Sequence, residues 1–354
     1  MPFIVRSLEA GIAGVVVLTV YYALTTPTVL CLAALAVLWG VYRRERKRAA
    51  GTIPLTGKHV LITGCDTGFG KDLAKRLHAL DCHVIATVLN PDGQGAKELR
   101  DVSSSRMTVL PLDVSSDDSV SKCLRLVRDM CSDSGLWGLV NNAGLSFSIG
   151  SIELTTMRQY LQYANVNIFG MVRTTRAFLP LIRQARGRIV NVTSVHGRMS
   201  MPCRAAYNLT KFAAETFSDI TRLEMAQFGV KVVVIEPGGF GRTADARFPQ
   251  AERLRGEFEE MWAEASEEVK ELYGREDMDK ILEGFKNSAH AARPGAPTTP
   301  VTDVMTEALT SGDPELRYLW TIRLKPYMSD RMFHRLTLYR FSHLTRFRRS
   351  PSVA

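Results

Sequence analysis

The chain has 354 residues, of which 45% are hydrophobic and 23% are charged, so it can bury one large core or two modest ones. Its formal net charge is +9, but much of the excess lies in residues 43–48 and in the C-terminal tail, both beside apolar sequence. That placement favours an anionic membrane surface and argues against nucleic acid. The six cysteines show no paired or metal-type spacing, which gives no support to a disulfide framework or a metal site.

An apolar stretch without charge runs from residue 11 to residue 41. It exceeds the roughly 18 residues that mark a transmembrane candidate. A break at residues 25–28 leaves two alternatives, one tilted helix kinked at Pro27 or two segments in a re-entrant hairpin. Because a basic cluster follows, we expect a membrane anchor over residues 1–42, a basic linker over 43–57, and the next domain on the cytosolic side.

Strand and helix patterns alternate after residue 58. Strands are predicted at residues 59–63, 82–89, 106–112, 136–140, 187–193 and 230–236, with helical patterns at 73–80, 116–131, 155–184 and 204–228. This alternation predicts an α/β fold with a Rossmann-type doubly wound parallel sheet. Ligands of such sheets bind beyond the carboxyl ends of the strands. Five residues fall at such ends: Gly64, Asp113, Asn141, Ser194 and Pro237.

The first strand runs into a glycine-rich turn, Gly64-Cys65-Asp66-Thr67-Gly68-Phe69-Gly70, which a helix follows. Glycines let the backbone approach a pyrophosphate, and the helix N-terminus faces the phosphate charge. The glycine spacing departs from the G-x-G-x-x-G template, so the turn alone is weak evidence for a dinucleotide site.

Tyr207 and Lys211 stand one turn apart on the predicted helix of residues 204–228. A tyrosine hydroxyl ordinarily loses its proton near pH ~10, and a neighbouring ammonium favours the phenolate and lowers that pKa. The pair therefore suits proton transfer to or from an alcohol oxygen. A packed ring with a solvated lysine is the alternative for this short motif.

Taken together, these motifs resemble the short-chain dehydrogenase/reductase family. The resemblance rests on the glycine turn, Asn141-Asn142-Ala143-Gly144, Asn167, Ser194 thirteen residues before Tyr207, and Pro237-Gly238. Further segments, such as Leu136-Trp137-Gly138-Leu139-Val140, look most like the branch of membrane-associated retinol, 17β-hydroxysteroid type 2 and D-β-hydroxybutyrate dehydrogenases. The match covers residues 58–237, and more loosely extends to a last strand near 317–320.

The resemblance implies roles for individual residues. Tyr207 would be the acid/base, Ser194 would hydrogen-bond the substrate oxygen, Lys211 would lower the pKa of Tyr207 and hold the nicotinamide ribose, and Asn167 would keep a water relay in place. The cofactor site would comprise Gly64, Asp66, Thr67, Gly68, Phe69, Gly70, Asp113, Asn141, Ala143, Gly144, Tyr207, Lys211, Pro237 and Gly238. The protein handles the proton, and the cofactor takes the hydride.

NAD is favoured over NADP as the cofactor. The acidic residue expected at the end of the second strand is absent, since Val88-Leu89-Asn90 stand there. However, Asp66 in the glycine turn would repel the extra phosphate of NADP, and no arginine occupies the strand end. Asp113 is expected to contact the adenine, to cap the helix that starts near Ser116, or to do both.

Beyond Pro237 the family pattern loosens. Residues 240–290 are expected to form a substrate lid around a charged helical segment at 247–273, although a plain surface helix fits as well. The dehydrogenase domain is placed at residues 58–322. The basic tail, residues 323–354, predicts an interfacial membrane helix; the alternative is a subunit-contact helix in a homodimer.

The sequence therefore predicts a membrane-anchored, NAD-dependent dehydrogenase for a lipophilic alcohol or ketone of the hydroxysteroid or retinol type, in the endoplasmic reticulum. One alternative is D-3-hydroxybutyrate dehydrogenase in a mitochondrial membrane, which needs a pocket cation such as Arg198 or Arg204. Another is a catalytically idle membrane scaffold.

Overall fold

The computed structural model describes residues 14–16, 19–22, 27–102, 104–145, 148, 150–238, 247–276, 279–280 and 298–319. The chain divides into two compact units. One comprises residues 1–53 with 311–313, and the other comprises residues 54–310 with 314–354. The second unit contains the sheet and all the predicted site residues.

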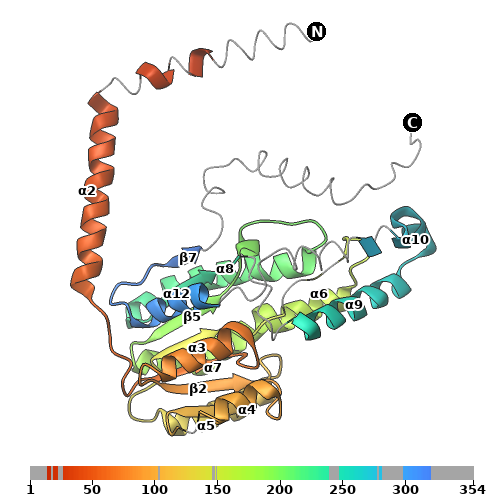
Figure 1. The fold of residues 1–354 in the computed structure, drawn as a ribbon, viewed down its shortest axis with the longest axis horizontal. Helices are drawn as coiled ribbons and strands as arrows, with labels where there is room; N and C mark the ends of the chain where they lie inside the picture. Colours follow the sequence, from red (N-terminus) through yellow and green to blue (C-terminus); the bar gives the residue numbers. More distant parts are fainter. Residues whose placement is uncertain are drawn as a thin grey trace. The chain divides into compact units, whose positions relative to one another are not determined.

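Seven parallel strands form one sheet in the order β3-β2-β1-β4-β5-β6-β7 (Figure 1). The strand order reverses between the neighbours β1 and β4, and ligands of such sheets bind in the crevice outside that point. The strands are β1 (His59–Ile62), β2 (His83–Val88), β3 (Met107–Pro111), β4 (Gly138–Asn141), β5 (Arg188–Val192), β6 (Lys231–Glu236) and β7 (Arg317–Leu319). The predicted α/β fold with a doubly wound parallel sheet is confirmed.

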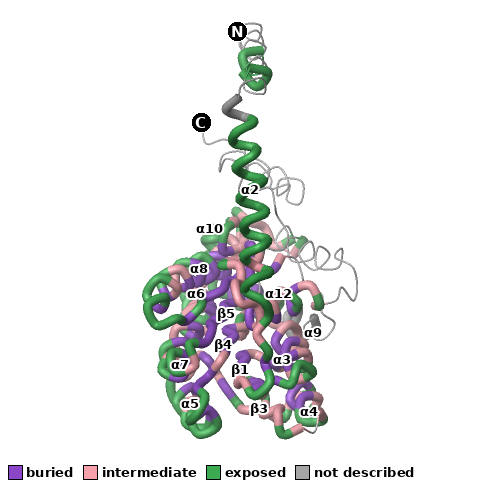
Figure 2. Tube along the Cα trace, turned by 90° about the vertical axis from the view of Figure 1, so that its left-hand side faces the viewer, coloured by how far each residue is buried: buried purple, intermediate pink, exposed green. Residues whose placement is uncertain are grey.

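Helices pack on both faces of the sheet. The apolar side chains of α3 (Gly68–His78), α4 (Gln94–Arg100) and α12 (Thr299–Thr310) share one core cluster with Val60 and Ile62 of β1. Those of α5 (Asp117–Met130), α7 (Met171–Gln184) and α8 (Ala205–Met225) share another with Leu61. Successive strand residues point to opposite faces, so β1 feeds both clusters, and its last three residues are buried (Figure 2).

The helix predicted as continuous over residues 155–184 is interrupted. It consists of α6 (Met157–Ala164), a π-helical turn η1 (Asn165–Gly170) and α7. Thr156 and Gln159 close a capping box at the start of α6. A π turn places one extra residue in the helix and occurs often at functional sites, and this one contains Asn167.

Part of the expected lid is described, as two helices rather than one segment. They are α9 (Arg247–Glu264) and α10 (Glu267–Tyr273), separated because the Ser266 hydroxyl caps α10 by accepting a hydrogen bond from the backbone of Val269. Phe258 and Met261 of α9 are buried against Leu154. Residues 240–246, 277–278 and 281–290 of the expected lid lie outside the described residues, as does the predicted tail from residue 323 onward.

Helix α2 (Pro27–Ala50) continues through residues 43–48. The sequence predicted a linker there. The segment is helical because lysine and arginine are good helix formers. Residues 1–13, 17–18 and 23–26 of the predicted anchor lie outside the described part of the chain. Among the residues that are described, no helix combines the length and the apolar character needed to cross a bilayer.

Candidate active site

The π turn holds Asn167 at the edge of the predicted site. Its side-chain oxygen accepts a hydrogen bond from the backbone N–H of Leu145 (2.7 Å), and its Nδ2 donates to the Leu145 carbonyl (3.0 Å). Nδ2 also donates to the Thr210 hydroxyl at 3.0 Å. Asn167 is 1% exposed and therefore joins the loop after β4 to the helix that carries Tyr207 and Lys211.

Ser194 follows β5, and Tyr207 lies in the first turn of α8; both are buried. Their side chains are joined by a hydrogen bond. The Ser194 hydroxyl also accepts a hydrogen bond from the backbone N–H of His196 (3.1 Å), and the backbone N–H of Tyr207 donates to Ser148 (3.2 Å). The structure thus brings the predicted hydroxyl and phenol together.

Lys211 is buried one helical turn after Tyr207. Its Nζ lies 5.6 Å from the centroid of the Tyr207 ring and donates a hydrogen bond to the carbonyl of Val192 at the end of β5 (3.2 Å). Burial lowers the pKa of Lys211 to about 8, opposed by the charge of Glu215. All four predicted catalytic side chains therefore gather where β4 and β5 end.

The charges around Tyr207 differ from the expectation. Burial raises the pKa of its phenol, while the hydrogen bond with Ser194 and the charge of Arg204 lower it. The sequence assigned the lowering to Lys211. The Lys211 ammonium lies over the ring and donates to a strand carbonyl, and the charge that lowers the pKa of Tyr207 together with the Ser194 hydrogen bond includes that of Arg204.

The glycine turn has the close contacts that a dinucleotide cradle requires. Gly64 adopts φ +71°, and a Cβ there would lie 2.8 Å from the Cα of Ala143. A Cβ on Gly70 would lie 2.4 Å from the Gly64 carbonyl oxygen. Only glycine fits at these two positions. The glycine turn leads directly into the N-terminus of α3 at Gly68, the kind of helix end that binds a pyrophosphate. The roles expected for Gly64, Thr67, Gly68, Phe69 and Gly70 in cofactor binding stay a prediction.

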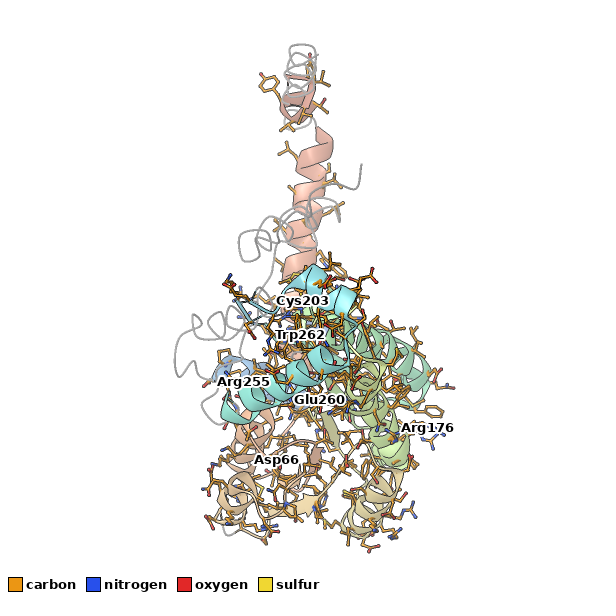
Figure 3. All side chains as sticks on the ribbon, turned by 90° about the vertical axis from the view of Figure 1, so that its right-hand side faces the viewer. Asp66, Arg176, Cys203, Arg255, Glu260 and Trp262 are labelled. Carbon is orange, nitrogen blue, oxygen red and sulfur yellow. The ribbon has the colours of Figure 1, made fainter. Side chains whose placement is uncertain are left out.

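Asp66 lies at the end of β2 as well as in the glycine turn. Its carboxylate accepts hydrogen bonds from the backbone N–H groups of Leu89 (3.0 Å) and Asn90 (3.0 Å) (Figure 3). The sequence has no acidic residue at the end of β2. Asp66, in the turn after β1, places its carboxylate there. Lys71 of α3 is paired with Glu98 of α4 at 3.0 Å.

The remaining predicted cofactor residues divide into two groups. Ala143, Gly144, Pro237 and Gly238 follow β4 or β6 at the same edge of the sheet; a Cβ on Gly144 would lie 3.8 Å from Lys211 Nζ. The side chains of Asn141 and Asp113 make hydrogen bonds within the protein, and their predicted contacts with the cofactor stay a prediction. Asn141 donates to Thr175 and Asn191 and accepts from Thr174, and Asp113 accepts from Ser115. The cap of α5 is Ser116.

Asn142 holds the glycine turn in shape, and the sequence prediction had not included it in the site. Its Nδ2 donates to the carbonyls of Thr63 (2.9 Å) and Gly64 (3.0 Å). The Thr63 hydroxyl accepts from the backbone N–H groups of Asn142 and Ala143. An amide directly after Asn141 in a strand-end motif was the signal that could have identified it.

Three further side chains surround Tyr207. The His196 ring meets the Tyr207 ring edge to face, with the centroids 5.8 Å apart. Tyr163 of α6 packs in one buried cluster with Tyr207. Burial lowers the pKa of the Arg204 guanidinium to about 10, and the neighbouring Tyr207, Cys203 and Tyr163 oppose that shift. Arg204 is therefore a half-buried cation at the predicted proton-transfer site.

Tyr163 also connects the site to α9. Its hydroxyl accepts a hydrogen bond from Arg253 (2.6 Å) and donates to the Glu257 carboxylate (3.0 Å). Arg253 and Glu257 are themselves paired, and Gln159 donates to the Glu257 carbonyl (2.8 Å). The part of the lid helix that carries Glu257 is thus fastened to α6, beside the cluster that contains Tyr207.

Comparison with known proteins agrees with this geometry. Residues 58–252 match the family of short chain dehydrogenases. A D-beta-hydroxybutyrate dehydrogenase, mitochondrial, from Bos taurus is 42% identical over 79% of this chain and 83% of its own. Retinol dehydrogenase 7 from Rattus norvegicus is 39% identical (82% and 88% covered), and retinol dehydrogenase 16 from Homo sapiens is 40% identical (80% and 87%).

A short-chain dehydrogenase structure from Streptomyces avermitilis shares the fold with a TM-score of 0.58, at 24% identity, covering 81% of this chain and 93% of that one. The fold and site define an NAD(P)-dependent oxidoreductase that acts on CH–OH groups. The chain belongs to the short-chain dehydrogenase family, and it is related to both the retinol and the D-β-hydroxybutyrate dehydrogenases.

Proposed function

We propose that this protein is an NAD-dependent dehydrogenase for a short 3-hydroxy acid of the D-3-hydroxybutyrate type. The observation that carries the proposal is the half-buried Arg204 guanidinium, whose charge acts on the Tyr207 phenol. A substrate whose hydroxyl lies at Tyr207 and whose carboxylate lies a few bonds away would place that anion at Arg204. Arginine is suited to such contacts because it binds carboxylates with two parallel hydrogen bonds.

Arg204 fits this role better than Arg198, the other cation that the sequence suggested. Arg198 is paired with the buried carboxylate of Glu236 at 2.7 Å, and its side chain is 42% exposed. Its charge is therefore already balanced by a protein group.

The residues of the site divide the proton chemistry among them. The Tyr207 oxygen takes the proton from the substrate hydroxyl during oxidation and returns it during reduction. Ser194, which is already hydrogen-bonded to Tyr207, orients the substrate oxygen. Lys211 and Asn167 hold the cofactor ribose and the proton path beside it. NAD, when bound, accepts the hydride from the substrate carbon.

The preference for NAD follows from the charges at the end of β2. The Asp66 carboxylate is held there by the backbone of Leu89 and Asn90, where it would accept a ribose hydroxyl and repel a 2′-phosphate. The nearby Lys71 is already ion-paired with Glu98. An incoming phosphate would therefore meet a carboxylate and a neutralised lysine.

A lipophilic alcohol of the retinol or hydroxysteroid type is the second candidate. It is favoured by the large apolar side chains that α2 exposes, among them Leu35 (61%), Leu38 (64%) and Trp39 (61%). Exposed apolar surface of this extent is typical of a membrane or protein contact. We propose that residues 1–42 and the basic tail attach the enzyme to a membrane, which would also give access to an apolar substrate dissolved there.

Two organelles fit the two substrates. A 3-hydroxy acid dehydrogenase is expected at a mitochondrial membrane, and a retinoid or steroid enzyme at the endoplasmic reticulum with its catalytic domain in the cytosol. Imaging the full chain, with a variant in which residues 11–41 are scrambled as control, distinguishes membrane attachment from its absence.

The substrate is tested by following NADH formation with the detergent-solubilised full chain and D-3-hydroxybutyrate, its L enantiomer, retinol and estradiol in turn. We expect the highest kcat/KM with D-3-hydroxybutyrate. Faster turnover of retinol or estradiol would transfer the assignment to the lipophilic class. Absence of turnover with any alcohol, by protein that still binds NADH, would favour the idle scaffold.

A further inference from the structure

A buried carboxylate, Glu215, lies one helical turn after Lys211 on α8 and has no role in the proton chemistry described above. The residue is 7% exposed. One oxygen accepts a hydrogen bond from Arg317 of β7. Glu215 therefore connects the helix of Tyr207 and Lys211 to the last strand of the sheet.

The turn after Ser194 packs directly on this part of α8. A Cβ on Gly197 would lie 2.9 Å from Glu215 Cγ and 2.9 Å from the Lys211 carbonyl oxygen. No side chain fits between η2 (Val195–Gly197) and the Lys211–Glu215 turn, so the two segments are held at a fixed separation. A shift of the Glu215 side chain would be transmitted to both Ser194 and Lys211.

Several other charges surround this turn, and they belong to four elements. Arg317 contacts both Glu215 and Asp219, and it lies 3.5 Å from Glu236 of β6, which pairs with Arg198. On α8, the titratable and charged groups facing Lys211 and Glu215 are Tyr207 and Asp219. The others are His196 on η2, Arg198 after it, Glu236 on β6 and Arg317 on β7. The negative group that acts on the Lys211 ammonium is Glu215.

We propose that Glu215, clamped by Arg317, is a positioning residue that keeps Lys211 charged and fixed beside Tyr207. The proposal rests on the role assigned above to Lys211 and is independent of which alcohol is the substrate. Burial lowers the pKa of Lys211 to about 8, and the carboxylate opposes that shift. Without the carboxylate, the ammonium would lose its proton at a lower pH, and with it the hold on the cofactor ribose.

The experiment compares the pH dependence of kcat/KM and of NADH affinity in the full-length enzyme and its Glu215→Gln variant. We expect the high-pH limb of both profiles to move to lower pH by about one unit, since a close opposite charge shifts a pKa by one to three units. Glu215→Asp, which keeps the charge but draws it back from Lys211, should shift the limb in the same direction by less. An unchanged limb in both variants would overturn the proposal.

Asp219→Asn is the matched control, because Asp219 also binds Arg317 but lies one turn further from Lys211 and its side chain is 45% exposed. It should leave the limb in place, and an equal shift in Asp219→Asn would show that loss of the Arg317 clamp alone accounts for the effect. Lys211→Met tests the role assigned to Lys211 separately from the action of Glu215 on it. If that variant keeps the wild-type limb, the role assigned to Lys211 fails, whatever Glu215 does.

Discussion

The carboxylate of Asp66 lies 3.0 Å from the backbone nitrogen of Asn90, so an acid from the turn after β1 occupies the end of β2. We predict that Asp66→Asn, which keeps an acceptor but removes the charge, raises the NADP to NAD ratio of kcat/KM by roughly tenfold, equivalent to about 1.4 kcal/mol. Asp72→Asn is the control, because Asp72 is bound to Thr298. Equal ratios in Asp66→Asn and wild type would refute the role of Asp66.

We predict that Asn167 acts by holding Leu145, after β4, and Thr210, on α8, at the same time. Asn167→Ala removes the hydrogen bonds to Leu145 and Thr210, and we expect a loss of about 1–3 kcal/mol in the free energy of unfolding. Displacement of the neighbouring helix should lower kcat on the order of 10- to 100-fold. Asn165→Ala is the control, because it tests whether any substitution in the same π turn lowers kcat. If it lowers kcat equally, Asn167 has no special role.

His196 makes stability depend on pH. Burial, together with the charge of Arg204, lowers the pKa of His196 to about 4, below its ordinary value near 6.5. Between these values the unfolded chain binds the proton and the folded chain does not, so stability falls as pH falls through this window. We expect a contribution of roughly 2 kcal/mol between pH 7 and pH 5.

The measurement is chemical denaturation of wild type and His196→Phe at the two pH values. His196→Phe should lose most of this pH dependence. The account of His196 would be wrong if the slopes of wild type and His196→Phe coincided.

Arg204 is predicted to select an anionic substrate. Arg204→Met should lower kcat/KM for D-3-hydroxybutyrate by roughly 10- to 100-fold, the size of a lost charged hydrogen bond. Turnover of a neutral secondary alcohol should fall less, because that substrate loses only the effect of the Arg204 charge on the Tyr207 phenol. Arg198→Met, which removes an arginine paired with Glu236, should leave this preference unchanged. An equal loss for charged and neutral alcohols in Arg204→Met would mean that Arg204 does not bind the substrate carboxylate.

Much of the fold could be read from the sequence because buried parallel strands are short apolar runs and site residues follow them directly. Ser194 is such a residue, and Tyr207 and Lys211 are related by a single helical turn. Asn167 was identified by resemblance, but its π turn was not, because the apolar periodicity of residues 155–184 continues through it. The turn is fixed by hydrogen bonds to Leu145 and Thr210, which periodicity does not show.

The electrostatics of the site could not be predicted for a related reason. Tyr163 and Glu257 are separated by 94 residues, yet their side chains meet beside the site. Arg204 precedes Tyr207 closely in the sequence, but apolar periodicity does not show that its charge acts on the phenol. The sequence suggested Lys211 as the cation that lowers the pKa of Tyr207, and in the structure the charge of Arg204 lowers it.

The most direct test concerns Tyr207 itself. Alcohol oxidation by Tyr207→Phe is measured alongside NADH binding, so that loss of chemistry is separated from loss of the cofactor. We predict that kcat falls by about 10²- to 10⁴-fold while NADH affinity stays within the wild-type range. Because burial raises the pKa of Tyr207, oxidation by the wild type should also rise with pH. Undiminished turnover by Tyr207→Phe would contradict the assignment of this phenol as the proton-transferring group.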